Sequence, residues 1–259
     1  MSVVVAIKAN GGVYLASDTQ VSAGQTKTYL TNENNYKAWK YPDVQGVVVG
    51  GTGNAYTMEI VQTGEYFRDV DIDRIDYRWL VQYFLPELLT DLVKFEDLEV
   101  SELGTLKSGA DLFIAIKDRI YSLRGETLFI AEESEYSAMG SGYYAAIASL
   151  DVTKGESLKK RLLKAVLAAS EYDYYVSGPV VILNTLNNDM IVVEDPLNEI
   201  LHGDDELRPS KGGFILPGLD KEETNEGGRG DIGKSTTEAG DKKEVEIKDN
   251  EVVFKKGGK

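Results

Sequence analysis

The sequence has 259 residues, of which 42% are hydrophobic, and its formal net charge is −15. This length accommodates one large or two small soluble domains. The longest apolar runs are shorter than the ~18 residues of a transmembrane helix, and the opening residues lack the basic and long apolar segments of a signal peptide. We therefore expect a cytoplasmic protein without membrane association, whose mature chain starts at Met1 or Ser2.

Cysteine is absent, and histidine occurs once, as His202. The lack of cysteine removes disulfides, thiolate zinc sites and cysteine nucleophiles, and a single histidine makes a poly-histidine metal site or a Ser-His-Asp triad hard to build. His202 is expected to be an exposed loop residue before Gly203. The acidic charge balance argues against binding to nucleic-acid phosphates. We expect no metal, no cofactor and no nucleic acid.

The first part of the chain predicts strands followed by two helices. Residues 3–8 and 13–18 are apolar and flank Asn10-Gly11, which is a strong β-hairpin signal. A third strand is expected at 45–50. Asn54 then caps a helix. The expected apolar face of this helix consists of Tyr56, Ile60 and Phe67.

A second helix is predicted over about 78–96, with a bend at Pro86. Apolar residues recur along it at helical spacing. They are Leu80, Phe84, Leu88, Leu92 and Val93.

Short strands and then helices follow. Strands are expected at 111–116, 120–123 and 128–131, and the next segments predict helices at 143–150 and 158–172. The second of these helices offers Leu162, Leu163, Val166, Leu167 and Ala169 for burial. Strands at 180–184 and 190–193 complete the series.

This order of elements predicts an α+β fold. Strands, two helices, strands, two helices and strands are typical of a four-layer αββα sandwich, in which two antiparallel sheets are flanked by helices. We assign residues 1–202 to this domain. Residues 203–259 form an acidic, Gly-rich C-terminal extension that is expected to be largely flexible.

The extension contains short motifs of its own. Residues 214–217 are apolar, and a small hairpin is expected in which Val245 and Ile247 face Val252 and Phe254. Residues 228–235 match the P-loop pattern. An apolar strand should precede a real P-loop, but the charged residues 221–226 stand there instead, so we interpret the match as chance. The Arg-Gly-Asp at 229–231 is also read as incidental.

Ser2 stands directly behind Met1 and at the head of an apolar strand. If Met1 is removed, one residue carries both a hydroxyl nucleophile and a free α-amine. The reference pKa of such an amine, about 7.7–8.0, allows it to accept the hydroxyl proton near neutral pH. Serine is small enough at the second position for removal of Met1 by a methionine aminopeptidase to be expected.

The layered order and Ser2 together resemble the proteasome β-subunit family of N-terminal nucleophile hydrolases, closest to its HslV-type bacterial peptidases. The resemblance covers roughly residues 2–193. Its local motifs are residues 12–18 with Gly24, residues 37–41, residues 50–55 and residues 140–142. Active members of that family typically begin with threonine, whereas this chain has Ser2, which keeps the hydroxyl and loses the methyl group that restricts the rotamer.

The resemblance implies catalytic roles for six residues. Ser2 would be the nucleophile. Lys37 would favour deprotonation of Ser2 and its amine, and Asp18 would hold Lys37. The remaining roles are an oxyanion-binding N–H for Gly50, with Gly51 as the adjacent candidate, and support of the amine for Ser141 and Ser177. Without the family pattern, Lys37 reads as a solvated residue, Asp18 as a turn cap and Gly50 as a turn glycine.

The match is weaker around the supporting aspartate. In the family pattern this residue falls on Tyr174, and Asp173 lies one position too early unless the end of the preceding helix is locally adjusted. The resemblance also places Ser22 where an extended substrate pairs with the backbone, and Val48 where the specificity pocket is lined. An apolar substrate preference follows from Val48.

The resemblance implies a peptidase that hydrolyses peptide bonds in unfolded protein. It further implies a homo-oligomeric ring and an ATP-dependent unfoldase partner. A proteasome-like structural or interaction protein without turnover is the alternative, favoured by the serine, the displaced aspartate and the long extension. A third interpretation takes the P-loop match as real and assigns nucleotide binding to Lys234.

Overall fold

The computed structural model describes residues 2–23, 26–41, 44–95, 98–100, 106–187, 189–207, 246–248 and 251–253. The chain divides into two compact units, Met1–Phe214 and Ile215–Lys259. In the second unit, β15 (Glu246–Lys248) pairs antiparallel with β16 (Glu251–Val253), and Ile247 lies opposite Val252 as the sequence predicts. Several predictions lie outside the described residues: the flexible extension, the 214–217 segment, the P-loop match, and Val245 and Phe254 of the hairpin.

The first sheet of the larger unit is built on the predicted N-terminal hairpin. Asn10 and Gly11 have φ values of 53° and 80°, the left-handed pair that a two-residue hairpin turn requires. All strand pairs of this sheet are antiparallel. The strand order is β12 (Tyr136–Met139), β1 (Val4–Ala9), β2 (Gly12–Ser17), β13 (Val180–Asn184) and β14 (Met190–Val193).

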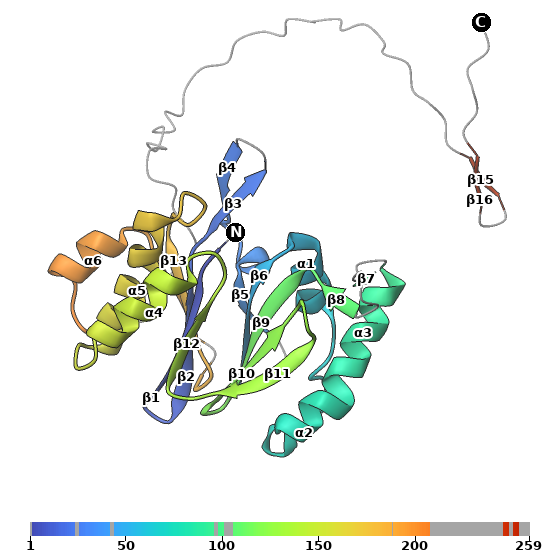
Figure 1. The fold of residues 1–259 in the computed structure, drawn as a ribbon, viewed down its shortest axis with the longest axis horizontal. Coiled ribbons are helices and arrows are strands. Elements are labelled where there is room, and N and C mark those ends of the chain that lie inside the picture. The colour runs from blue at the N-terminus through green and yellow to red at the C-terminus, as the bar shows by residue number, and fades with distance from the viewer. Residues whose placement is uncertain are drawn as a thin grey trace, which may run out of the picture. The chain divides into compact units, whose positions relative to one another are not determined.

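The second sheet also has five antiparallel strands and faces the first (Figure 1). Its order is β11 (Phe129–Glu133), β10 (Arg119–Arg124), β9 (Ala110–Ile116), β6 (Val47–Gly53) and β5 (Ala38–Lys40). Because side chains alternate along a strand, β1 contributes to two cores. Val4 and Ala6 pack between the sheets, whereas Val3, Val5 and Ile7 pack under helices on the other face.

Helices cover both outer faces (Figure 1). One layer, on the second sheet, consists of α1 (Ala55–Thr63), α2 (Tyr77–Trp79), η3 (Leu80–Phe84) and α3 (Leu85–Lys94). The other layer, on the first sheet, consists of α4 (Tyr143–Val152) and α5 (Leu158–Tyr172), with α6 (Pro196–His202) packed against α5. This arrangement confirms the predicted four-layer αββα sandwich. Among the described helices, none combines the length and apolar character that a membrane span needs.

The helices differ from the predictions in detail. Asn54 caps α1 by accepting the Tyr56 N–H, as expected. The helix ends at Thr63, so Phe67 lies beyond it and is buried from the following turn. Tyr56, which was expected on the buried face, is 47% exposed. Val93 is exposed as well, because it falls beside the buried stripe of α3.

The second predicted helix contains a π-helical turn, η3, before Pro86. There the Leu85 N–H donates to the Leu80 carbonyl. Proline has no N–H to continue a regular helical ladder, and the wider turn absorbs this interruption.

Some elements were not predicted. They are the hairpin of β3 (Gln20–Ala23) and β4 (Thr26–Tyr29), the strands β5 and β12, the pair β7 (Leu98–Val100) and β8 (Leu106–Ser108), the helix α6 and the short turns η1 (Glu33–Asn35) and η2 (Ile72–Arg74). The residues of β4 are all exposed, so no apolar alternation marks that strand. His202 is exposed as expected, but it ends α6 and is not part of a loop.

Candidate active site

Ser2 lies at the start of β1, where the chain meets the turn between β12 and α4. The Ser2 N–H donates to Ser141 Oγ at 3.1 Å, and the Ser2 carbonyl accepts the Gly142 N–H at 3.3 Å. Ser2 is 2% exposed. Gly140 has a φ of 93°, and a Cβ there would lie 2.2 Å from the Ser2 carbonyl oxygen, so only glycine permits this approach. The turn therefore fixes the Ser2 backbone from two sides.

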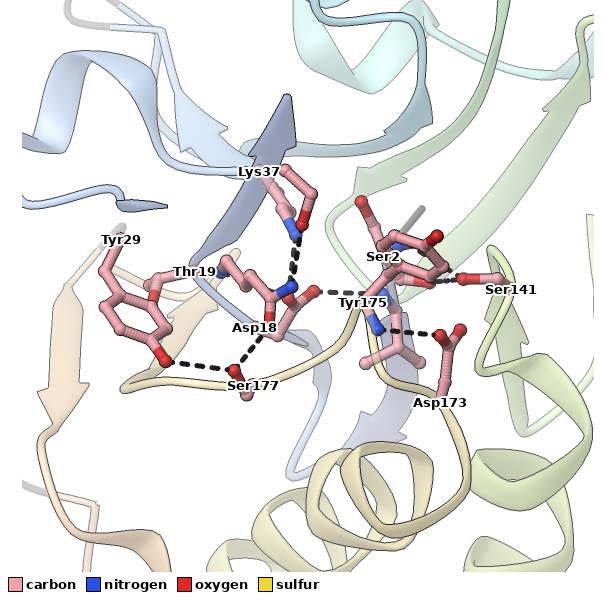
Figure 2. Close-up of polar contacts among 12 residues, drawn as sticks. Ser2, Asp18, Thr19, Tyr29, Lys37, Ser141, Asp173, Tyr175 and Ser177 are labelled. Carbon is pink, nitrogen blue, oxygen red and sulfur yellow. Dashed lines mark hydrogen bonds and ion pairs between the residues drawn. The ribbon is translucent and has the colours of Figure 1, made fainter. Parts of the chain in front are cut away.

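Asp18 follows β2 and joins the Ser2 region to Lys37. Its Oδ1 accepts the Val3 N–H at 3.0 Å, and its Oδ2 accepts the Gln20 N–H at 3.2 Å and the Lys37 Nζ at 2.7 Å (Figure 2). Asp18 is fully buried and Lys37 is 3% exposed. The residue after the predicted nucleophile and the predicted lysine are thus held by one carboxylate.

Burial controls the titration of this ion pair. Removal from water raises the pKa of the Asp18 carboxyl, although the charge and the hydrogen bond of Lys37 act to lower it. Removal from water lowers the pKa of the Lys37 ammonium, although the carboxylates of Asp18 and Asp173 act to raise it. Burial disfavours the charged form of each group. Lys37 therefore loses its proton more readily than a lysine on the surface.

Asp173 lies near enough to this ion pair for its charge to act on Lys37, and Figure 2 shows its carboxylate bonded to the Tyr175 N–H. Asp173 ends α5 with extended backbone angles, φ −121° and ψ 110°. Its Oδ1 accepts the Tyr175 N–H at 2.9 Å, and its buried Oδ2 has no hydrogen-bond partner. Tyr174 is 66% exposed. A supporting role for Asp173 stays a prediction.

Ser177 belongs to a separate network. Its hydroxyl donates to Gln20 Oε1 and lies 3.2 Å from the Tyr29 hydroxyl. The Gln20 Nε2 in turn donates to Ser22 Oγ at 2.7 Å. These contacts attach the β3–β4 hairpin to the loop after α5. The structure does not bring Ser177 or Ser22 into contact with Ser2, and Ser22 has a half-buried position on β3.

Gly50 lies inside the sandwich, opposite Ala38 of β5 and Phe113 of β9. A Cβ at Gly50 would lie 2.8 Å from Val4 Cγ1, so packing of the two sheets explains this glycine. The Gly51 N–H donates to the Lys37 carbonyl at 2.8 Å. Since successive N–H groups along a strand point to opposite sides, the Gly50 N–H is directed toward β9. An oxyanion role for either glycine stays a prediction.

Val48 is the residue that was expected to line the specificity pocket, and this role stays a prediction. It is fully buried in the core between the sheets, in contact with neither solvent nor the cavity beside Ser2. The position of Val48 on the inward face of β6 explains this burial, because side chains alternate along the strand. Val48 therefore gives no support for an apolar specificity pocket.

A cavity of about 310 Å³ opens beside Ser2. Its walls come from the ends of β6 and β9, the turn after β10 and the turn before α4. This cavity was not predicted, because the segments that form it are far apart in the chain. The lining residues are Ser2, Thr52, Gly53, Ser108, Gly109, Ala110, Asp111, Glu126, Gly140 and Ser141. Within the described ranges, no cluster of His, Asp or Glu is suited to hold a metal ion.

Comparison with known proteins supports the fold. No protein-family model and no curated protein matches the sequence. Among solved structures, BPH of Thiobacillus denitrificans in complex with epoxomicin matches with a TM-score of 0.53 and 22% identity, over 72% of this chain and 99% of that chain. Anbu, the ancestral β-subunit from Yersinia bercovieri, matches with a TM-score of 0.54 and 14% identity, over 77% of this chain and 90% of that chain.

The chain has the proteasome β-subunit-like fold. This is the fold of the N-terminal nucleophile hydrolases, as the resemblance implied. Since the match takes in nearly the full length of BPH, this chain contains the whole of the proteasome-like fold together with additional residues. The site around Ser2, Asp18, Lys37 and Ser141 lies within that fold.

Proposed function

We propose that the protein is a proteasome-like peptidase whose nucleophile is Ser2, exposed as the N-terminal residue by removal of Met1. The observation that carries this proposal is the buried Asp18, which contacts both the Val3 N–H and the Lys37 ammonium while Ser141 contacts the Ser2 nitrogen. This arrangement holds a hydroxyl, an amine and a lysine at one place, which is what N-terminal nucleophile catalysis requires.

In the proposed reaction, Ser2 Oγ attacks the carbonyl carbon of a peptide bond. The Ser2 α-amine accepts the hydroxyl proton and passes it to the departing amine of the substrate, which leaves an ester between Ser2 and the acyl half. Water, deprotonated by the same α-amine, then cleaves the ester and releases the second product. Ser141 Oγ holds the amine at hydrogen-bond distance throughout.

Lys37 acts in this reaction through its charge. A nearby ammonium favours the deprotonated forms of both the Ser2 hydroxyl and the Ser2 amine. Asp18 fixes the position of Lys37. Asp173 supports the site from the end of α5, and its negative charge helps to keep Lys37 protonated.

We also propose that the protein assembles into a homo-oligomeric ring that encloses its active sites, and that it receives unfolded protein from an ATP-dependent unfoldase. The support for both is the proteasome-like fold. An enclosed peptidase limits cleavage to chains that enter the ring.

A structural or interaction protein without turnover is the second candidate. The observation that favours it concerns the two N–H groups that were expected to bind the oxyanion. The Gly51 N–H already donates to the Lys37 carbonyl, and the Gly50 N–H is directed toward the neighbouring strand β9. Catalysis through these amides requires that one of them be released or shared. The two candidates differ in whether Ser2 is a free N-terminus and in whether its hydroxyl matters.

The first prediction tests this difference. Intact mass of the purified chain is expected to show loss of Met1. Ser2→Ala, which keeps the amine and removes the hydroxyl, is expected to lower peptide hydrolysis about 1000-fold or more. Ser2→Thr should retain activity. Hydrolysis of fluorogenic peptides, with and without epoxomicin, is the measurement.

Ser134→Ala is the matched control, because Ser134 is an exposed serine in the turn between β11 and β12. It should hydrolyse the peptides at the wild-type rate. A mature chain that retains Met1 would disprove the proposed peptidase and leave the structural role. A Ser2→Ala chain with wild-type turnover would show that the hydrolysis comes from another site or from a contaminant, and would disprove Ser2 as the nucleophile.

A further inference from the structure

The cavity beside Ser2 has several polar residues in its lining. Thr52 and Ser108 provide hydroxyl groups, and Asp111 and Glu126 provide carboxylates. Lys107 precedes Ser108 in the chain but is not part of the lining. A substrate residue next to the scissile bond therefore meets an acidic wall, and the two carboxylates differ in what they contact.

Asp111 is neutralised within the protein. Its Oδ1 accepts the Gly125 N–H at 2.8 Å, and its Oδ2 lies 3.5 Å from the Arg124 guanidinium. The charge of Asp111 is thus balanced by a neighbouring cation, and its oxygens hold the turn after β10 in place. Asp111 shapes the wall and contributes little net charge to it.

Glu126 is positioned by the same turn. The Gly125 carbonyl accepts the Ser108 N–H at 2.8 Å, and a Cβ at Gly125 would lie 2.3 Å from the Ala110 carbonyl oxygen. The turn is therefore packed tightly on β9, and the next residue, Glu126, borders the cavity. Among the residues that the structure describes, no cation forms an ion pair with the Glu126 carboxylate.

We propose that this cavity receives a basic side chain of the substrate, lysine or arginine, and that Glu126 selects it. This inference rests on the proposed peptidase function. Gly109 and Ala110, which have little or no side chain, leave room for the methylene groups of such a substrate side chain. Its charged end then reaches the exposed Glu126 carboxylate. The selected substrates are basic peptides, which the overall charge of −15 also attracts.

The second prediction compares matched reporter peptides that carry lysine or norleucine on either side of the scissile bond. The wild-type chain is expected to prefer lysine, and Glu126→Gln should lower the lysine-to-norleucine ratio of kcat/KM about threefold, the effect of one partly exposed charge pair. Added salt should weaken the preference through screening. Turnover of the norleucine peptide should stay near the wild-type value.

Glu135→Gln is the matched control. Glu135 is exposed, and its carbonyl accepts the Lys8 N–H at the far end of β1, about 20 Å from Ser2 at the usual rise per residue. The lysine preference should survive this change. A lysine-to-norleucine ratio that is the same in wild type and Glu126→Gln overturns the inference, while Ser2-dependent hydrolysis still supports the proposed function.

A binding measurement keeps the two proposals separable. The Ser2→Ala chain is titrated with labelled lysine and norleucine peptides, and fluorescence anisotropy reports their affinities. Tighter binding of the lysine peptide that is lost in Ser2→Ala/Glu126→Gln supports the inference even without turnover. Equal affinities for the two peptides overturn it.

Discussion

Ser141 and Ser177 were both expected to support the Ser2 amine, and the structure places them in two different groups of side chains. The inner group, Asp18, Lys37 and Ser141, contacts the backbone of Ser2 and Val3. The outer group, Gln20, Tyr29 and Ser177, is joined by side-chain hydrogen bonds, and it meets the inner group where the Gln20 N–H donates to Asp18 Oδ2. It reaches solvent through Tyr29, which is 44% exposed. Charge in the inner group can act on Ser2, whereas the outer group positions the β3–β4 hairpin.

The strongest test of the difference between the two groups is to remove the positive charge of Lys37 from the inner group. Lys37→Met is expected to lower kcat/KM on the order of 100-fold or more, because the Ser2 amine and hydroxyl lose the cation that favours their deprotonation. It also leaves the Asp18 carboxylate buried without its counter-ion, so the free energy of unfolding should fall by about 3 kcal/mol. Peptide hydrolysis and denaturant unfolding measure the two effects.

Lys40→Met provides the matched control, since Lys40 is an exposed lysine on β5. Neither activity nor stability should change much in this variant. If Lys37→Met hydrolyses peptides as fast as Lys40→Met, the inner group has no catalytic role.

A smaller effect is expected for Asp173→Asn, which tests whether the end of α5 belongs to the inner group. The carboxylate of Asp173 raises the pKa of Lys37, so its removal lets that pKa fall further. Because Lys37 acts as a cation, activity is lost as pH rises through its pKa. The alkaline limb of the wild-type profile should lie below the ordinary lysine value of 10.5, and in Asp173→Asn it should move to lower pH.

The pH dependence of kcat/KM measures this shift, and we expect the variant to lose activity at an alkaline pH where the wild-type chain is still active. Asp118→Asn, a charge change in the exposed turn after β9, should leave the limb in place. An unshifted limb in Asp173→Asn would show that Asp173 serves only to end the helix.

The smallest effect is expected in the outer group. Ser177→Ala removes the hydroxyl that bonds to Gln20 and Tyr29, so the free energy of unfolding should fall by about 1 kcal/mol. Since Ser177 does not contact Ser2, kcat/KM should change less than about threefold. A loss as large as that of Lys37→Met would place Ser177 in the catalytic group and remove the distinction between the two.

Sequence alone was sufficient where local chemistry decides the structure. The Asn10-Gly11 turn, the Asn54 cap and the apolar stripe of α5 each depend on residues close together in the chain. These predictions are confirmed, except that Leu167 of α5 is only half-buried. The hairpin of β3 and β4 was missed because β4 is exposed and polar. Its position comes from contacts with a loop about 150 residues away, such as that between Tyr29 and Ser177.

The site shows the same division. The resemblance placed Ser2, Asp18, Lys37 and Ser141 in one region, and the structure brings them together. It did not resolve Asp173, whose direction depends on the backbone angles at the end of α5. The cavity beside Ser2 could not be predicted, because its lining depends on how the ends of separate strands meet.

Lys159 of α5 has a practical consequence for shortening the chain. Its buried ammonium binds Glu199 and the Asp204 carbonyl, Asp205 bonds to Ser157, and Leu207 packs on the core under α5. These residues belong to the first unit, Met1–Phe214. An expression variant that ends at residue 202 would lose the contact between the buried Lys159 ammonium and the Asp204 carbonyl, and the packing of Leu207. We therefore expect the shortest stable truncation to keep residues through Leu207.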